Sequence, residues 1–533
     1  MRTTTMSDLP TSASPRGTLL SQQGRGRAHA LAVGGLLWVL LAAPLPAQTV
    51  NWAEVHNTTM RGIDNLYGLE IDKAAATFDS VCHMAPTDPR GYFFKSMVNF
   101  WLFALRRNQD DYDTFMDESD KVISACESIL ESDEDNPVAT FYLGGIYGYR
   151  GMAHQANGSM FKAVTEGRKG YIYLEEAVAL DSTLYDAQMG FGLFRYMIAK
   201  APRSLSWIAS VLGFSGDLEG GLALLKHAAE KGLYTKTEAA YYLAQFLFAE
   251  HRQDEAFHYM RMVIDRYPDN TLFLLTLAGW QLRLNNPDEA LGLAQKAAAI
   301  TDRKKFRYGE EFLYSTLGGI YYSLNEFTKA RDAYALYLQK VQTREYISNW
   351  MYYRMGVSHE IAGDRTRAAE IYRMMRKADD AERAWDARYY RMGQDRLGAP
   401  LGEVDVLLIK AGNEAARKRY EPALALYNEA LAKGAGNPDL QARALYGEQG
   451  IYYDHGEYPQ VVTLSHQLLS THPVRELWLI PHGYFRLGQA LAKLGRTEEA
   501  RQAFEKISEY DDYESQTSLE SRAEEELARL KKN

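Results

Sequence analysis

Apolar residues recur along most of this chain with the spacing of amphipathic helices rather than the strict alternation of strands. The stretch that begins at Thr237 shows the pattern clearly, with the small residues Ala244 and Ala256 in two successive apolar segments and Pro268 at the end of the unit. The same order of large, small and polar positions returns after about 34 residues. Each unit therefore predicts two antiparallel α-helices, which we call helix A and helix B.

Seven units follow this pattern, and each places small residues where its two helices should cross. They start near Thr237, Thr271, Glu311, Trp350, Val404, Ala442 and Pro481. In three of them a pair ending in glycine on helix A precedes a large ring on helix B: Leu317-Gly318 and Tyr334, Met355-Gly356 and Tyr372, Leu487-Gly488 and Phe504. Because a single helix pair cannot bury its own apolar face, neighbouring units must stack on one another.

The period and these positions resemble the tetratricopeptide repeat. The resemblance implies an all-α solenoid, a right-handed superhelix of antiparallel helix pairs, with about 10–11 pairs in this chain. We expect an irregular helical region with longer pairs at 48–235, a regular array at 236–510 and a C-terminal capping helix at 511–533.

The first half follows a looser version of the repeat. Residues 71–78 read as a helix B, and residues 90–107 and 138–152 read as strongly apolar helices A. Gly170 comes later than the regular spacing allows, which predicts longer helices or an inserted turn in this region.

Residues 186–232 carry the most distinctive local sequence. Pro202 can start an apolar helix, Gly213 and Gly216 form a tight turn, and Ser215 or Asp217 can cap the next helix. The run from 190 to 225, with FGLF, AP, LS and LGFSGDLEGGLALL in order, resembles the tetratricopeptide repeat protein 39 family and its fungal inclusion-body clearance relatives. The resemblance covers roughly 60–300, extends to a group of exported bacterial repeat proteins, and implies a helical scaffold without an assigned catalytic centre.

The N-terminus has the features of an export signal. Arg16, Arg25 and Arg27 precede an apolar run at 31–45, which is short for a membrane span of about 20 residues. A signal peptide that occupies residues 1–47 and is cut after Ala47 is favoured over an uncleaved anchor. We therefore expect an exported protein, periplasmic or associated with the outer membrane.

Charge argues against nucleic acid as a partner. The chain carries 60 Lys and Arg against 69 Asp and Glu. Four Arg and one Asp fall within residues 1–47, so the remainder has a net charge of −12. Nucleic-acid binders instead concentrate positive charge.

Candidate catalytic and metal motifs fail on their spacing. His359-Glu360 opens like a zinc-protease motif, but Gly363 stands where the second His is required. The carboxylates Asp111, Asp113, Asp117 and Asp120 lack the order of a calcium loop, and we expect them on a solvated first turn of a helix. Ser215 between glycines lacks the nucleophile-elbow spacing. We expect no enzyme activity, no metal and no cofactor.

Cys82 and Cys126 are the chain's two cysteines. Export would permit a disulfide, but two small buried apolar residues are the favoured interpretation.

The aromatic residues suggest a binding surface. Six of them occupy helix positions that should face the concave groove: Tyr241, Phe248, Tyr322, Tyr353, Tyr446 and Tyr453. Tyrosine suits an interface because it combines a large area with one hydrogen bond, although the same rings could simply pack one helix on the next. If the groove binds, Tyr322, Tyr353 and Tyr453 should be partly exposed.

The leading hypothesis is thus a non-enzymatic scaffold of the cell envelope that binds a peptide or a helix of a protein partner in its concave groove. One alternative is a membrane-associated component of an outer-membrane complex, with the apolar 201–214 helix touching lipid or a membrane protein. Another is an accessory protein that holds a lipid or a carbohydrate.

Overall fold

The computed structural model describes residues 50–201, 216–304, 309–341, 344, 347–377 and 380–531. The chain divides into two units, residues 1–50 and 51–533, and the description below concerns the second. The predicted signal peptide, and residues 202–214 of the apolar segment, lie outside the described residues.

The described residues form 24 α-helices, one short 3-10 helix and no strand, so the all-α prediction is confirmed. The helices are α1 (Trp52–Tyr67), α2 (Ile71–Met84), α3 (Pro89–Arg106), α4 (Gln109–Leu130), α5 (Pro137–Ala156), α6 (Met160–Leu180), α7 (Tyr185–Ala199), α9 (Leu218–Lys231), α10 (Lys236–Ala249), α11 (Gln253–Arg266), α12 (Thr271–Arg283), α13 (Pro287–Lys304), α14 (Glu310–Ser323), α15 (Phe327–Lys340), α16 (Asn349–Ile361), α17 (Arg365–Arg373), α18 (Asp380–Gly398), α19 (Glu403–Ala416), α20 (Tyr420–Lys433), α21 (Pro438–Asp454), α22 (Tyr458–Leu469), α23 (Leu479–Lys493), α24 (Thr497–Glu505), η2 (Lys506–Glu509) and α25 (Gln516–Leu530).

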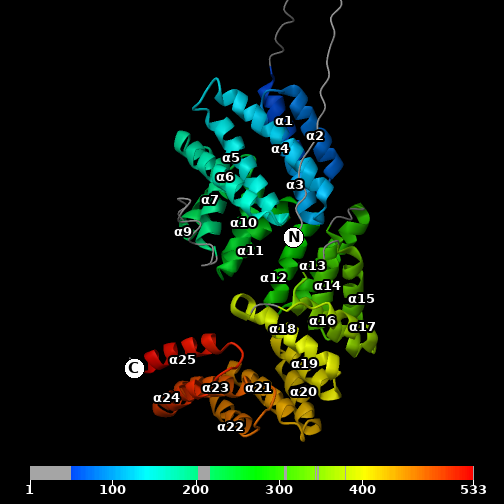
Figure 1. Cartoon of the computed structure of the whole chain (residues 1–533), viewed down its shortest axis with the longest axis vertical. Helices are drawn as coiled ribbons and strands as arrows, with labels where there is room; N and C mark the ends of the chain where they lie inside the picture. Colours follow the sequence, from blue (N-terminus) through cyan, green and yellow to red (C-terminus); the bar gives the residue numbers. More distant parts are fainter. Residues whose placement is uncertain are drawn as a thin grey trace, which may run out of the picture. The chain divides into compact units, whose positions relative to one another are not determined.

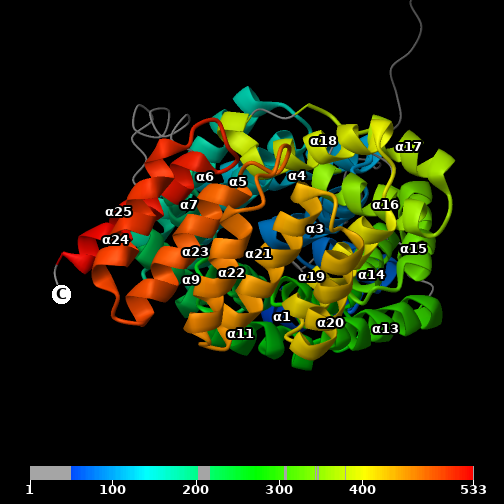
Figure 2. The ribbon, with the colours of Figure 1, turned by 90° about the horizontal axis from the view of Figure 1, so that it is seen from below.

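Helix pairs are the building unit (Figure 1). Within the described part of the chain, eleven pairs pack hairpin-fashion, from α1 with α2 to α23 with α24. Each pair contacts the next, except that α18 follows the pair of α16 and α17. The C-terminal helices α21, α22 and α23 lie side by side (Figure 2). This arrangement is a helical-repeat solenoid.

The small crossing residues lie where the repeat pattern requires them. Ala256 and Ala330 are fully buried. A Cβ added to Gly356 would come within 2.2 Å of the Tyr372 ring, and one added to Gly318 within 2.4 Å of the Tyr334 ring. Helix A can therefore approach helix B only because these positions carry no side chain.

The first half departs from the regular repeat. The pair α5 and α6 has helices of 20 and 21 residues, as the late position of Gly170 suggested. The side chain of Asp217 accepts a hydrogen bond from the backbone of Gly220 at 2.9 Å and so caps α9, as the sequence allowed.

The end of α1 packs against much later helices. Arg266 forms a 2.9 Å ion pair with Asp64, and Asn270 donates a 2.8 Å hydrogen bond to the Tyr67 carbonyl. Lys304 donates another, also 2.8 Å long, to the Gly68 carbonyl. These contacts join the start of the repeat array to α11, α12 and α13, and so enclose the space between them.

Helix α18 interrupts the repeat. It packs on α16 and α17 without a hairpin partner of its own among the described helices. The next pair meets an earlier turn, because Asn413 on α19 donates 2.8 Å hydrogen bonds to the Tyr322 carbonyl and to the Asn325 side chain.

The structure shows the surroundings of Asp111 and of the two cysteines. Asp111 does not lie on a solvated turn, because it is buried and forms an ion pair with Arg106. Both cysteine thiols are free, and burial raises the pKa of Cys82 to about 11 and that of Cys126 well above its usual value. Among the described helices, none is both long and apolar enough to cross a bilayer.

Candidate functional site

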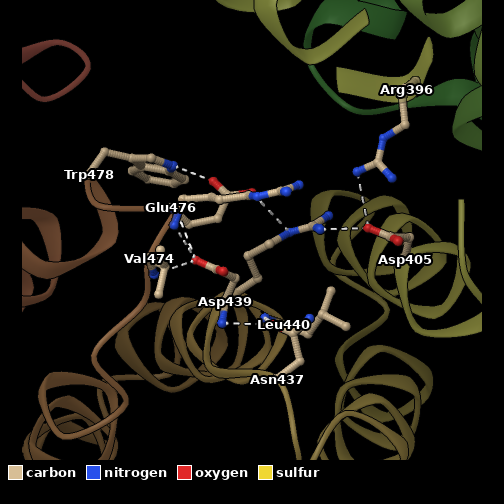
Figure 3. A network of polar contacts seen from close by, with 10 residues as sticks. Arg396, Asp405, Asn437, Asp439, Leu440, Val474, Glu476 and Trp478 are labelled. Atoms are coloured by element: carbon tan, nitrogen blue, oxygen red, sulfur yellow. Dashed lines mark hydrogen bonds and ion pairs between the residues drawn. The ribbon is translucent and has the colours of Figure 1, made fainter. Parts of the chain in front are cut away.

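A carboxylate at the start of α21 holds the loop that precedes α23. Asn437 caps the helix by accepting from the backbone of Asp439 and Leu440 at 3.0 and 3.2 Å. Oδ1 of Asp439 then accepts three backbone hydrogen bonds of 2.8–2.9 Å from residues 474–476 (Figure 3). The loop between α22 and α23 is thus fixed to α21 by one side-chain oxygen.

A chain of ion pairs runs from α18 to this loop. Asp405 on α19 accepts from Arg396 at 3.2 Å and from Arg443 at 2.8 Å (Figure 3). Arg443 lies 3.8 Å from Glu476, which accepts a 2.7 Å hydrogen bond from the indole N–H of Trp478. Burial raises the pKa of Asp405, but the two guanidiniums outweigh burial and leave that pKa below its usual value.

Cations and rings from three helices and the loop meet beside this chain. The Arg486 guanidinium lies 4.1 Å from the Tyr446 ring centre, and the Arg388 guanidinium lies 5.0 Å from that of Trp478. The Trp478 ring contacts Tyr446 at 5.4 Å and His482 at 5.2 Å, both edge to face. We call these five residues, all partly exposed, the arginine–aromatic face.

Three guanidiniums surround His482 on the arginine–aromatic face. Burial, together with the nearby guanidiniums of Arg486, Arg522 and Arg388, lowers the pKa of His482 to about 4. Glu514 forms a 3.2 Å ion pair with Arg388, yet burial still raises the pKa of this carboxyl. His482 therefore stays neutral at physiological pH, and arginine supplies the positive charge.

The loop also exposes apolar side chains next to this face. Val474 is 72% exposed and Leu477 is 54% exposed, with the exposed Arg475 between them. Because Asp439 fixes the backbone here, these side chains are presented on an ordered support.

The structure separates the six aromatic residues predicted from the sequence. Tyr322 and Tyr353 are 6% and 5% exposed and belong to one core cluster, so the expectation of partial exposure is wrong for both. The cause is packing between repeats: the Arg354 guanidinium lies 4.7 Å from the Tyr322 ring centre, and Tyr389 of the inserted α18 lies 5.6 Å from Tyr353.

The other four are partly buried and lie in different places. Tyr241 donates or accepts a 3.2 Å hydrogen bond with Thr276, and Phe248 stacks on Trp280 at 4.4 Å. Tyr453 packs against Tyr458 at 5.6 Å. Tyr446 alone of the six belongs to the arginine–aromatic face.

Sequence reasoning missed the partners of Tyr446. Trp478 and Arg388 lie outside the regular helix A positions, on a loop and on the inserted helix. His482 and Arg486 do lie on helix A of the last unit, one turn apart, a spacing that puts both side chains on one face. From this spacing alone, the sequence could have predicted that His482 and Arg486 lie together.

His359 and Glu360, which resemble the start of a zinc-protease motif, form hydrogen bonds within the protein. His359 is buried with Nδ1 3.4 Å from an Asp364 oxygen, and burial lowers its pKa. Glu360 accepts from the Tyr372 hydroxyl at 3.0 Å and from the Leu401 backbone at 2.9 Å. Within the described ranges, no three His, Cys, Asp or Glu side chains are grouped as metal ligands.

Comparison with protein families agrees with the repeat architecture. The profile described as Iml2/Tetratricopeptide repeat protein 39 matches residues 180–377, and the Tetratricopeptide repeat profile matches residues 481–512. The chain thus contains tetratricopeptide repeats. Its Iml2/tetratricopeptide repeat protein 39 region begins later and extends further than the 60–300 expected from the sequence.

Two solved structures that match this chain have low sequence identity and low TM-scores. The repeat domain of P58(IPK) has 13% identity over 78% of this chain and 95% of that chain, with a TM-score of 0.20. Yeast Tom70 has 13% identity over 86% and 99% of the two chains, with a TM-score of 0.29. No curated protein matches the sequence.

Proposed function

We propose that this tetratricopeptide-repeat protein is a non-enzymatic scaffold that binds an acidic peptide segment of a protein partner on the arginine–aromatic face. The observation that carries the proposal is the pair of guanidiniums, Arg486 and Arg388, held over the rings of Tyr446 and Trp478. Arg, Trp and Tyr are the residues that most often dominate protein interfaces.

An acidic partner fits the chemistry of this face. Nη1 of Arg486 donates a 2.8 Å hydrogen bond to the Tyr446 carbonyl, and Nη1 of Arg388 pairs with Glu514. The remaining N–H groups of the two guanidiniums are the ones that would bind a carboxylate of the partner. The full chain carries a net charge of −9, so a local group of arginines favours acidic segments at this place. Val474 and Leu477 offer neighbouring contacts for apolar side chains of the same segment.

Fluorescence anisotropy with a labelled synthetic peptide tests the proposal. A peptide of alternating Glu and Leu should bind the protein, and a matched peptide with Gln in place of Glu should bind at least about tenfold more weakly. Arg486→Ala and Arg388→Ala should each weaken binding of the acidic peptide by about tenfold, with stronger effects at low salt.

Arg501→Ala provides the matched control. Arg501 lies on α24 and is paired with Glu498 and Glu505, so its loss changes the net charge equally without touching the face. Equal binding of the two peptides, or an equal effect of Arg501→Ala, would contradict the proposal.

We further propose that the protein is exported and works in the cell envelope, periplasmic or associated with the outer membrane. The support is the sequence of residues 1–47, with arginines ahead of a short apolar run and a small-residue cleavage site. N-terminal sequencing of the protein from a periplasmic fraction should start at Gln48. A cytoplasmic protein that retains residues 1–47 would refute export.

A further inference from the structure

The interior of the first repeats contains an apolar cavity of about 280 Å³. Its wall is formed by α1, α3, α5, α6, α7 and α10, whose lining side chains are mostly aromatic and aliphatic. Met160 and Met197 line it and are 52% and 42% exposed, so the cavity opens to solvent on their side. It is separate in sequence and in lining from the arginine–aromatic face.

Glycines create this space. A Cβ added to Gly170 would lie 2.7 Å from the Gly148 backbone nitrogen, so α5 and α6 cross with their backbones in contact. Gly145, Gly148 and Gly167 line the cavity and contribute no side chain at these three points of its wall. A Cβ on Gly167 would meet only the Phe194 ring, at 3.7 Å, and would otherwise face open space.

Two carboxyl groups lie in this apolar wall, and that of Glu238 has an oxygen without a partner in the described part of the chain. Glu238 is 7% exposed, and its Oε1 atom has no hydrogen-bond partner among the described residues. Burial raises the pKa of Glu238 to about 7, although the hydroxyls of Tyr149 and Tyr67 act in the opposite direction. A buried polar atom without a partner is unfavourable by about 1–3 kcal/mol, so a ligand group that bonds to this oxygen would gain part of that energy.

The other acidic group in the wall is already satisfied. Oδ1 of Asp186 accepts from the backbone of residues 233–235 and from the Thr235 hydroxyl, all at 2.8–3.0 Å. Glu238 is thus the place where a molecule in the cavity can form a new hydrogen bond.

The size and chemistry of the cavity define its ligand. An apolar cavity of about 150 Å³ holds benzene, so this one suits on the order of ten to fifteen non-hydrogen atoms. A hydroxyl can donate to the carboxylate of Glu238 or accept from its protonated form, whereas a ligand carboxylate would place a second negative charge beside it. We propose that the cavity binds a chain-like apolar alcohol whose hydroxyl group bonds to Glu238.

Displacement of the neutral fluorescent probe 1-aminoanthracene, whose size lies within this range, from the full chain tests the proposal. 1-Decanol should displace the probe at concentrations about tenfold lower than 1-methoxydecane, which has the same chain but no hydroxyl donor, or than decanoate. Equal displacement by 1-decanol and 1-methoxydecane would overturn the assignment of a hydroxyl ligand.

Two matched glycine variants locate the site. Gly167→Leu should fill the cavity and weaken probe binding by at least about tenfold. Gly292→Leu, on α13, has no atom within 4 Å of its new Cβ and should leave probe binding unchanged. If Gly167→Leu binds the probe as well as the unaltered protein does, the cavity is not the site.

Two glutamates provide the second pair. Glu238→Leu should retain the probe but lose the preference for 1-decanol over 1-methoxydecane. Glu448→Leu should keep that preference, because Glu448 is also buried, with its pKa raised to about 7, but does not line the cavity. A preference that survives Glu238→Leu would refute the role of Glu238. If Glu238→Leu does not fold, the two glycine variants still test the location of the site, and the comparison of 1-decanol with 1-methoxydecane still tests the hydroxyl ligand.

Discussion

Asp186 and Asp439 occupy the same place in two distant repeats and make the same contacts. Each is the second residue of its helix, α7 or α21, and each receives three backbone N–H groups from the turn before a later helix A. The distances are 2.9–3.0 Å for Asp186 and 2.8–2.9 Å for Asp439. A single carboxylate oxygen thus fixes the spacing between neighbouring repeats at both positions.

Removal of either carboxylate should loosen the turn that it holds. Asp186→Ala should lower the free energy of unfolding by at least about 3 kcal/mol, because Asp186 is buried and its donors would lose a charged acceptor. Asp439→Ala should have a smaller effect, about 1–2 kcal/mol, since its site is only partly buried. Hydrogen exchange should accelerate at residues 233–235 in the first variant and at residues 474–476 in the second. Unchanged exchange at these amides would contradict the assigned role.

The glycine at the helix crossing gives a second prediction. Gly356→Ala should destabilise the protein by about 1–3 kcal/mol, because the new Cβ would lie 2.2 Å from the Tyr372 ring. Gly279→Ala, on α12, meets no atom within 4 Å and should be neutral or stabilise by up to about 1 kcal/mol. Urea unfolding followed by circular dichroism separates the two outcomes. Similar effects for both variants would show that the crossing is looser than the structure indicates.

The repeat register could be predicted because it depends on local rules. Small residues such as Gly318 and Gly356 mark where helices cross, and their spacing is visible without any knowledge of tertiary contacts. The inserted α18 was missed, although the units at Trp350 and Val404 stand about 20 residues further apart than one period.

The candidate site could not be predicted in the same way. Whether a ring such as Tyr353 is buried or exposed depends on the next repeat, here on Tyr389 of the inserted helix. The neighbours of Tyr446 come from a loop and from α18, and only tertiary contacts bring these segments together. The cavity could not be predicted from the sequence either, because its wall combines six helices between residues 52 and 249.

The titration of Glu238 predicts a pH dependence of stability. Burial raises its pKa from 4.5 to about 7, so the folded protein holds this proton more tightly than the unfolded chain does. The resulting stabilisation is full below about pH 4.5 and is lost as pH rises to about 7, at up to about 1.4 kcal/mol per pH unit. The melting temperature relative to Glu238→Gln should therefore be higher at about pH 5 than at about pH 8. A difference that does not change with pH would show that Glu238 is not buried as described.

The corrected placement of the tyrosines gives the last prediction. Tyr353→Ala should lower the free energy of unfolding by about 3–5 kcal/mol, because a ring that is only 5% exposed leaves a core cavity when removed. Tyr446→Ala should leave the melting profile closer to that of the unaltered protein, since the ring is only partly buried. It should nevertheless weaken binding of the alternating Glu–Leu peptide by about tenfold, because the Arg486 guanidinium would lose the ring that positions it. Thermal melting and anisotropy on the same two samples measure both effects. If Tyr446→Ala unfolds the protein, or folds and binds the peptide with unchanged affinity, then the ring serves packing alone and the arginine–aromatic face is not the binding surface.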